Sequence, residues 1–263
     1  MSVNLRLTCV LCCAVGLLLG AESASASTIT FENGGATLQV RADTDPVNSM
    51  KIGLVPGNLD DYRIADTASD IGAIPSSCLR ETARSVRCPS DKVGAVSVFL
   101  SNGSDTFSVL DPANIAGNVT LTVRGGLGDD NIAGRFGAGK EFLYGNDGND
   151  VVTAHCPGDG KTVNGGPGND LLSICGTTQP RSLALYGLPH LAASGGIGTL
   201  IGEGGNDRLT GGPESDYIKA GAGNDVAKGG PGKDIIDCGA GKRDLGVGGG
   251  GRDLGKNCEK VKH

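Results

Sequence analysis

The sequence predicts an all-β solenoid built from short strands and glycine turns, and three observations support this prediction. The chain of 263 residues contains 46 glycines, is only 3% aromatic and has no tryptophan. An ordinary core relies on large aromatic side chains, and so many glycines would be costly inside helices or long strands. The third observation is a repeat, because residues 202–237 divide into four units of nine residues. Units of this length stack into a solenoid in which each unit contacts its neighbours.

Two positions of the nine-residue unit hold the same kind of residue in all four copies. The eighth position is apolar and is expected to point inward from a very short strand: Leu209, Ile218, Ala227 and Ile236. The sixth position is always aspartate: Asp207, Asp216, Asp225 and Asp234. Small residues at the start of each unit permit a tight turn with positive φ and bring backbone carbonyls close together. The unit therefore places a carboxylate in a turn that is rich in carbonyl groups.

Stacking of the units predicts what this turn binds. If two units form one coil, residues eighteen apart lie above one another, so Asp207 stacks on Asp225 and Asp216 on Asp234. Neighbouring strands lie about 4.8 Å apart, and at that spacing unpaired carboxylates would repel each other. Ca²⁺ takes six to eight oxygen ligands, including carboxylates and backbone carbonyls. The sequence therefore predicts calcium ions between the coils.

The four units, GEGGNDRLT, GGPESDYIK, AGAGNDVAK and GGPGKDIID, resemble the haemolysin-type (RTX) calcium-binding nonapeptide repeat. The resemblance implies a right-handed parallel β-roll in a secreted bacterial calcium-binding protein. It also implies that Asp carboxylates and backbone carbonyls hold Ca²⁺ in the turns between successive coils.

Three earlier units, GGLGDDNIA, GNDGNDVVT and GGPGNDLLS, carry Asp130, Asp150 and Asp170. These aspartates are twenty residues apart, close to one coil, so one side of each early coil is expected to keep the calcium turn while the other has a variant loop. Calcium sites there should form a single column. The 37 residues between Asp170 and Asp207 suggest about two coils, of which the middle one, around residues 181–196, has lost its aspartate. The predicted metal ligands are Asp130, Asp150, Asp170, Asp207, Asp216, Asp225 and Asp234.

The N-terminus has the pattern of a Sec signal peptide over residues 1–26. Arg6 supplies the positive charge, residues 7–20 are apolar, and Ala24-Ser25-Ala26 fits a small-residue cleavage site. A transmembrane anchor is the rival interpretation, but roughly fourteen apolar residues are too few to span a bilayer comfortably. Secretion to the extracellular space, without membrane insertion, is the expectation.

The mature chain is expected to have three parts. Residues 27–123 form a β-rich N-terminal cap region, with a hairpin around Asn33-Gly34-Gly35, strands near 95–100 and 119–123, and a degenerate unit containing Asp105. This region is either an extension of the solenoid or a separate small β-sandwich. Residues 124–246 form the calcium-binding roll. Residues 247–263 form a C-terminal cap, where the repeat decays and leaves the calcium roles of Asp244 and Asp253 open.

Six of the nine cysteines remain after removal of the signal peptide. An even number in an oxidising compartment suggests three disulfides. Because each segment of a solenoid contacts only its sequence neighbours, the favoured pairs are Cys78–Cys88, Cys156–Cys175 and Cys238–Cys258.

Composition and motifs argue against several functions. The formal charge of −6 does not favour nucleic acid as a partner. The chain has neither the H-E-x-x-H zinc-protease motif nor the G-x-S-x-G nucleophile elbow, so no catalytic residues and no enzymatic activity are expected. The predicted function is a secreted, monomeric calcium-binding protein in which metal binding is coupled to folding. The alternative is an extracellular adhesion module in which calcium only stabilises the scaffold and residues 28–123 contact a partner. A hydrolase with its site in the same region is the third hypothesis.

Overall fold

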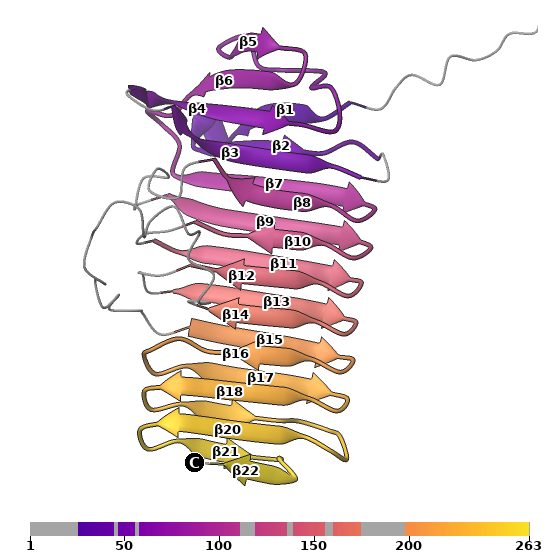
Figure 1. Cartoon of the computed structure of the whole chain (residues 1–263). Coiled ribbons are helices and arrows are strands. Elements are labelled where there is room, and N and C mark those ends of the chain that lie inside the picture. The colour runs from indigo at the N-terminus through magenta and orange to yellow at the C-terminus, as the bar shows by residue number, and fades with distance from the viewer. Residues whose placement is uncertain are drawn as a thin grey trace, which may run out of the picture.

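The computed structural model describes residues 26–44, 47–55, 58–110, 119–135, 139–155, 160–174 and 198–262. Its strands form two sheets, one of ten and one of twelve strands, that run the length of the molecule (Figure 1). One short 3-10 helix, η1 (Asn33–Gly35), interrupts the strands of the described residues. The all-β prediction is therefore confirmed.

The two sheets share the chain strand by strand. The first contains β1 (Thr28–Glu32), β2 (Thr37–Arg41), β7 (Ala95–Asn102), β9 (Thr120–Leu127), β11 (Glu141–Asp147), β13 (Lys161–Pro167), β15 (Gly198–Gly204), β17 (Tyr217–Ala222), β19 (Ile235–Asp237) and β21 (Leu254–Lys256). The second contains β3 (Ser49–Val55), β4 (Asn58–Asp66), β5 (Leu79–Thr82), β6 (Ser85–Pro89), β8 (Thr106–Val109), β10 (Asn131–Ala133), β12 (Val151–Ala154), β14 (Leu171–Ile174), β16 (Arg208–Thr210), β18 (Val226–Pro231), β20 (Leu245–Gly250) and β22 (Lys260–Lys262). From β7 onward the chain alternates between the sheets, so two successive strands make one coil.

Parallel pairing between successive coils sets the repeat length. Val151 lies opposite Leu171 in the early coils, and Tyr217 lies opposite Ile235 in the later ones. The first pair is twenty residues apart and the second eighteen, as the spacing of the aspartates predicts. The eighth-position side chains of the four units are buried between the sheets, with at most 2% of their surface exposed. Inward-facing apolar side chains, one set per coil, therefore form the core.

One coil count from the sequence is wrong. The 37 residues between Asp170 and Asp207 were expected to form about two coils, but β13 pairs directly with β15 and β14 with β16. One coil step therefore spans this distance, with the additional chain inserted between β14 and β15. A solenoid tolerates such an insertion because strand pairing, and not the length of the connection, carries the stack. The expected coil around residues 181–196 lies outside the described residues.

The N-terminal strands continue both sheets. β1 and β2 form the expected antiparallel hairpin, β2 pairs with β7, and β3 pairs with β8. β3, β4 and β6 then extend the second sheet by antiparallel pairing. The buried apolar residues of this region and of the coils belong to one cluster. The boundaries proposed between the three parts of the chain remain a prediction.

Two of the three predicted disulfides are present. Cys78 is bonded to Cys88 near the N-terminal end, and Cys238 to Cys258 near the C-terminal end. The predicted pair Cys156–Cys175 lies outside the described residues.

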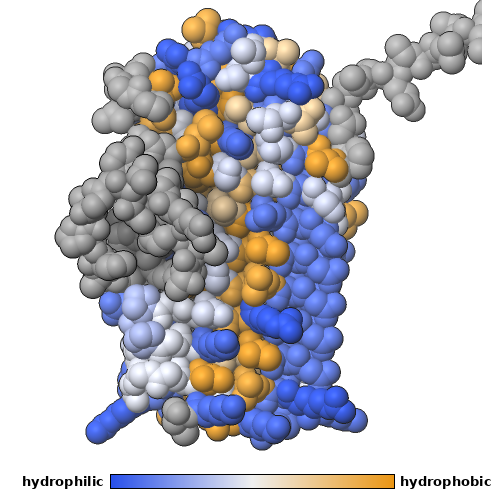
Figure 2. Space-filling model, viewed as in Figure 1, coloured by the Kyte–Doolittle hydropathy of each residue, from blue (hydrophilic) through white to orange (hydrophobic). Residues whose placement is uncertain are grey.

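The surface is largely polar, but Figure 2 shows a stripe of hydrophobic side chains along one face of the roll. Outward-pointing large apolar residues include Leu171, Tyr217 and Ile235, which are 47%, 38% and 40% exposed. Within the described residues, no helix has the length and apolar character needed to cross a membrane.

Glycine is required where one coil approaches the next, and Gly168 provides a test. Its φ is +152°, and a methyl group there would overlap the carbonyl oxygen of Gly148 in the preceding coil. Gly204, whose carbonyl accepts the Gly168 N–H, has open space around its Cα. We expect Gly168→Ala to lower the free energy of unfolding by about 2 kcal/mol or more. Gly204→Ala, the matched control, should change it by less than about 1 kcal/mol. Chemical denaturation of both variants in one buffer checks this, and equal losses would contradict the close approach.

Candidate metal centre

Carboxylates form two columns, one at each edge of the roll. The first column consists of Asp105, Asp130, Asp150, Asp170, Asp207, Asp225, Asp244 and Glu259. In it, the backbone N–H of each residue donates to a carboxylate oxygen of the next, at 2.7 to 2.9 Å. The second column consists of Asp216, Asp234 and Asp253. It begins where the Gly198 N–H donates to Asp216 Oδ1 at 2.8 Å, and it continues by the same hydrogen bond from coil to coil.

All seven aspartates that the sequence singles out lie in these columns. Asp207 stacks on Asp225, and Asp216 on Asp234, as the eighteen-residue spacing predicts. In the early coils Asp130, Asp150 and Asp170 belong to the single first column.

Four members of the columns are absent from the sequence-based set. Asp105 carried a signal, because the degenerate unit around it keeps the glycine and apolar positions. Asp244 and Asp253 follow their predecessors by nineteen residues, one more than the period, and this obscured them. Glu259 left no signal, since neither its spacing nor its residue type matches the repeat.

The second oxygen of most column aspartates is buried without a hydrogen-bond partner. This holds for Oδ2 of Asp105, Asp130, Asp150, Asp170, Asp207, Asp225, Asp234 and Asp244. A buried acceptor without a donor costs roughly 1–3 kcal/mol, and more when the group is charged. Repetition of this cost from coil to coil indicates a partner that is not part of the chain.

Backbone carbonyls of the adjacent coil converge on the same places. A methyl group at Gly125 would overlap both Asp130 Oδ2 and the Gly145 carbonyl oxygen. The same holds at Gly202, for Asp207 Oδ2 and the Ala220 carbonyl. At each place a carboxylate oxygen without a donor thus lies close to a backbone carbonyl oxygen. An oxygen-only set of this kind suits a hard cation such as Ca²⁺.

The ligand set must combine different coils and backbone groups. Among the described residues, no three His, Cys, Asp or Glu side chains gather in a cluster that could hold a metal ion. Each turn contributes one buried column carboxylate, so carbonyl groups of the turns would supply further oxygens of a cation site.

Comparison with known proteins agrees with this geometry. The family model described as RTX calcium-binding nonapeptide repeat, with four copies, matches residues 137–155, 193–225 and 210–245. Residues 137–155 and 193–245 carry RTX calcium-binding nonapeptide repeats. No curated protein and no solved structure matches the chain.

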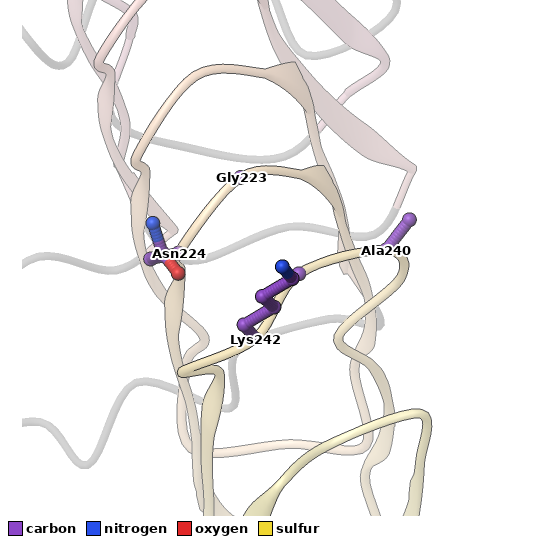
Figure 3. A pocket seen from close by; sticks show the side chains of 5 residues that line it. Gly223, Asn224, Ala240 and Lys242 are labelled. Carbon is purple, nitrogen blue, oxygen red and sulfur yellow. The ribbon is translucent and has the colours of Figure 1, made fainter.

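Beside the first column, the RTX turns carry an exposed ladder of amide side chains. The Asn149 side-chain oxygen accepts the Asn169 N–H at 2.9 Å, and the same bond links Asn169 to Asn206 and Asn206 to Asn224. The ladder reaches a shallow pocket lined by Gly223, Asn224, Ala240, Gly241 and Lys242 (Figure 3). These side-chain bonds support the turns from outside, while the carboxylates lie within.

Burial disfavours the ionised form of the column aspartates. It raises the pKa of Asp130 and Asp170 to about 7, and neighbouring carboxylates of the column add to the effect. Burial likewise raises the pKa of Asp105, Asp150, Asp207 and Asp234 to about 6. These values exceed the usual pKa of about 4, so the native carboxyls hold their protons to higher pH than the unfolded ones do.

This difference predicts how the stability of the calcium-depleted protein depends on pH. A raised carboxyl pKa contributes stability that is present below about pH 4 and is lost as the pH rises through 6 to 7. We therefore expect the free energy of unfolding to be greater at pH 5 than at pH 8, by about 2 kcal/mol or more, since one pKa unit corresponds to about 1.4 kcal/mol. Urea denaturation of the depleted protein at both pH values measures this.

The variant Asp150→Asn is the control for this prediction. Its amide oxygen can still accept the Asp130 N–H, but the titrating group is removed. The difference between pH 5 and pH 8 should become smaller in this variant. Greater stability of the depleted wild type at pH 8 would contradict the assignment.

Proposed function

We propose that the protein binds Ca²⁺ between successive coils and that binding is coupled to folding of the roll. The observation that carries this proposal is the series of buried Oδ2 atoms without a donor, several of which lie beside a carbonyl of the next coil: those of Asp130, Asp150, Asp207 and Asp234. The ligands would be the seven aspartates Asp130, Asp150, Asp170, Asp207, Asp216, Asp225 and Asp234, joined by Asp105, Asp244 and Asp253 and by turn carbonyls. Bound Ca²⁺ would neutralise the carboxylates and bridge the coils.

Coupling to folding follows from the electrostatics. Without a cation, each ionised column carboxylate is buried near others of its kind, which opposes stacking. With Ca²⁺, the same oxygens become attractive, and the free energy of binding adds to that of folding. We further propose that the protein is secreted, since disulfides persist in oxidising compartments and the turns would find calcium there. No observation on the described residues favours the adhesion or hydrolase hypotheses over calcium binding.

Isothermal titration calorimetry of the depleted protein tests the site. We expect several Ca²⁺ equivalents for the wild type and at least one fewer for Asp207→Asn/Asp225→Asn. In this variant the side-chain oxygens can still accept the Asp170 and Asp207 N–H groups, so the charge is the main change. Asp91→Asn, which removes an exposed charge in the N-terminal region, is the control and should keep the wild-type stoichiometry. Absence of binding heat, confirmed by equilibrium dialysis, would overturn the proposed function.

Far-UV circular dichroism tests the coupling to folding. Calcium-depleted protein should show less β-structure than protein in millimolar Ca²⁺, and the change should follow the binding isotherm. The disulfides constrain the two ends of the roll and leave part of the signal in the depleted state. Identical spectra at both calcium levels, despite measured binding, would separate the two claims and leave calcium as a ligand of a preformed roll.

A further inference from the structure

Three charged side chains are buried on the side of the early coils that lies opposite the first column. Arg135 and Glu141 are fully buried, and Lys161 is 1% exposed. The Lys161 ammonium lies 3.1 Å from Glu141 Oε2 and donates to the Arg135 carbonyl oxygen at 3.5 Å. Buried charges are costly unless they are paired, so this cluster requires an explanation beyond packing.

Strand register places this cluster in line with the second column. Glu141 lies opposite Lys161, and Lys161 lies opposite Gly198. Gly198 in turn donates its N–H to Asp216, the first aspartate of the column. One row therefore runs along the roll through Glu141, Lys161, Gly198, Asp216, Asp234 and Asp253.

Glu141 shares with the column aspartate Asp216 the hydrogen bond from its own turn, although the Leu121 N–H of the preceding coil donates to the Lys140 carbonyl and not to Glu141. Asp216 Oδ2 accepts the Gly212 N–H at 2.6 Å, and Glu141 Oε1 accepts the Arg135 N–H at 2.8 Å. In both turns a glycine immediately precedes the donor, and its Cα abuts the carboxylate. Gly134-Arg135 thus corresponds to Gly211-Gly212, and the longer side chain of glutamate reaches the place of the aspartate from a longer turn.

The cation beside the carboxylate differs between the N-terminal end of the row, at Glu141, and the aspartates from Asp216 onward. At Glu141, the ammonium group of the next coil contacts one carboxylate oxygen and one carbonyl oxygen, the two kinds of ligand that Ca²⁺ takes. We propose that the Lys161 ammonium is a built-in cation that takes the place of Ca²⁺ at the N-terminal end of the second column. This inference rests on the proposed calcium binding of the other turns.

The charge balance of the cluster supports the substitution. Lys161 and the Arg135 guanidinium both interact with the single carboxylate of Glu141. Two cationic side chains beside the Glu141 carboxylate disfavour a divalent cation at that position. In this proposal the Glu141 carboxylate is neutralised without metal, whereas the column from Asp216 onward contains an oxygen without a donor, Asp234 Oδ2, that Ca²⁺ would bind.

Replacing Lys161 by a small residue should restore a calcium site. We compare wild type, Lys161→Ser and the control Lys219→Ser, which alters an exposed lysine on β17. In calcium-free buffer, Lys161→Ser should have a lower Tm than wild type because Glu141 loses its partner. Added Ca²⁺ should recover most of this loss, and calorimetry should show one more Ca²⁺ equivalent than wild type. Lys219→Ser should match wild type in both measurements.

Several outcomes would overturn the inference. An unchanged stoichiometry with the same loss of Tm at both calcium levels would leave Lys161 as an ion-pair partner only. An unchanged Tm in calcium-free buffer would also overturn it. Either result leaves the proposed function intact if the wild type binds calcium. If neither the wild type nor Lys161→Ser binds calcium, both the proposed function and the built-in cation are overturned.

Residue-resolved hydrogen exchange of the wild type tests the inference even if Lys161→Ser does not fold. The N–H groups of Arg135 and Gly212 make equivalent bonds to Glu141 and Asp216. On calcium removal, exchange at Gly212 should accelerate by about tenfold or more, while exchange at Arg135 should change little. Equal acceleration at both positions would overturn the built-in cation.

Discussion

A buried carboxylate with one oxygen bonded and the other without a donor is the constraint on which this structure depends. Oδ1 of each column aspartate accepts an N–H from the preceding coil and sets the spacing of the stack, while Oδ2 of Asp130, Asp150, Asp207 and Asp234 lies beside a carbonyl of the following coil. The glycine that begins most units follows from this arrangement, because the carboxylate fills the space that a Cβ would need; the Asp225 unit begins with Ala220 instead. The high glycine content is thus a consequence of placing a charge inside the turn.

The two edges of the roll satisfy this constraint in different ways. The first column is continuous from Asp105 to Glu259, and its turns are short in every coil. Among the described residues, the second edge has stacked aspartates only from Asp216 onward, and Glu141 is the buried carboxylate of an earlier coil there. In the early coils, the stretches of sequence between β8 and β9 and between β14 and β15 are longer than those between the later strands. Insertions therefore occur where the turn is not held by a column of aspartates.

Periodicity predicts those parts of the structure in which every coil repeats the same residue. The eighth-position core and the stacking of Asp207 on Asp225 could be predicted in this way. Two disulfides could be predicted from a different rule, that segments of a solenoid contact their sequence neighbours. The single coil step between Asp170 and Asp207 could not, because sequence distance does not separate a coil from an inserted connection. Lys161 and Glu259 were also missed. Glu259 takes the place of a column aspartate, and Lys161 takes the proposed place of a calcium ion. A search for the repeated residue types does not find either of them.

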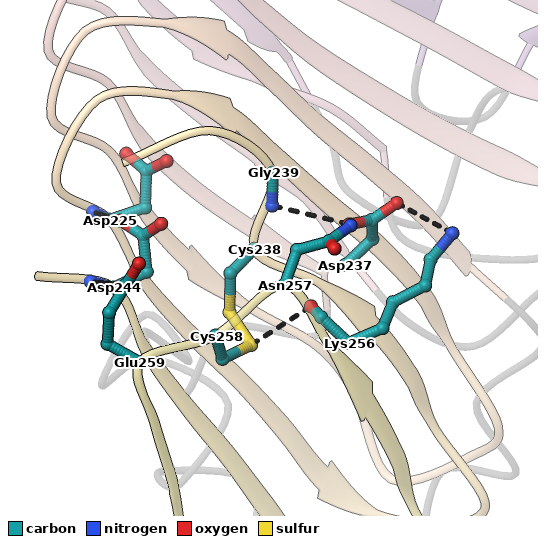
Figure 4. The surroundings of a disulfide bond; sticks show 9 residues. All are labelled: Asp225, Asp237, Cys238, Gly239, Asp244, Lys256, Asn257, Cys258 and Glu259. Atoms are coloured by element: carbon teal, nitrogen blue, oxygen red, sulfur yellow. Dashed lines mark hydrogen bonds and ion pairs between the residues drawn. A yellow bond between two sulfur atoms is a disulfide. The ribbon is translucent and has the colours of Figure 1, made fainter. Parts of the chain in front are cut away.

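The ends of the first column show why the cap regions are part of the metal-binding scaffold. At the N-terminal end, Asn48 donates its backbone N–H to Asp105 Oδ1 at 2.6 Å and so begins the ladder from outside the repeats. At the C-terminal end, the Asp244 N–H has no further aspartate to meet, and Glu259 supplies the acceptor at 2.7 Å. The adjacent Cys258 is bonded to Cys238, and Lys256 pairs with Asp237 at 2.8 Å (Figure 4). These two links do not involve calcium. They hold Glu259, the last acceptor of the first column, in place before any Ca²⁺ binds. The coils can therefore stack from a fixed C-terminal end.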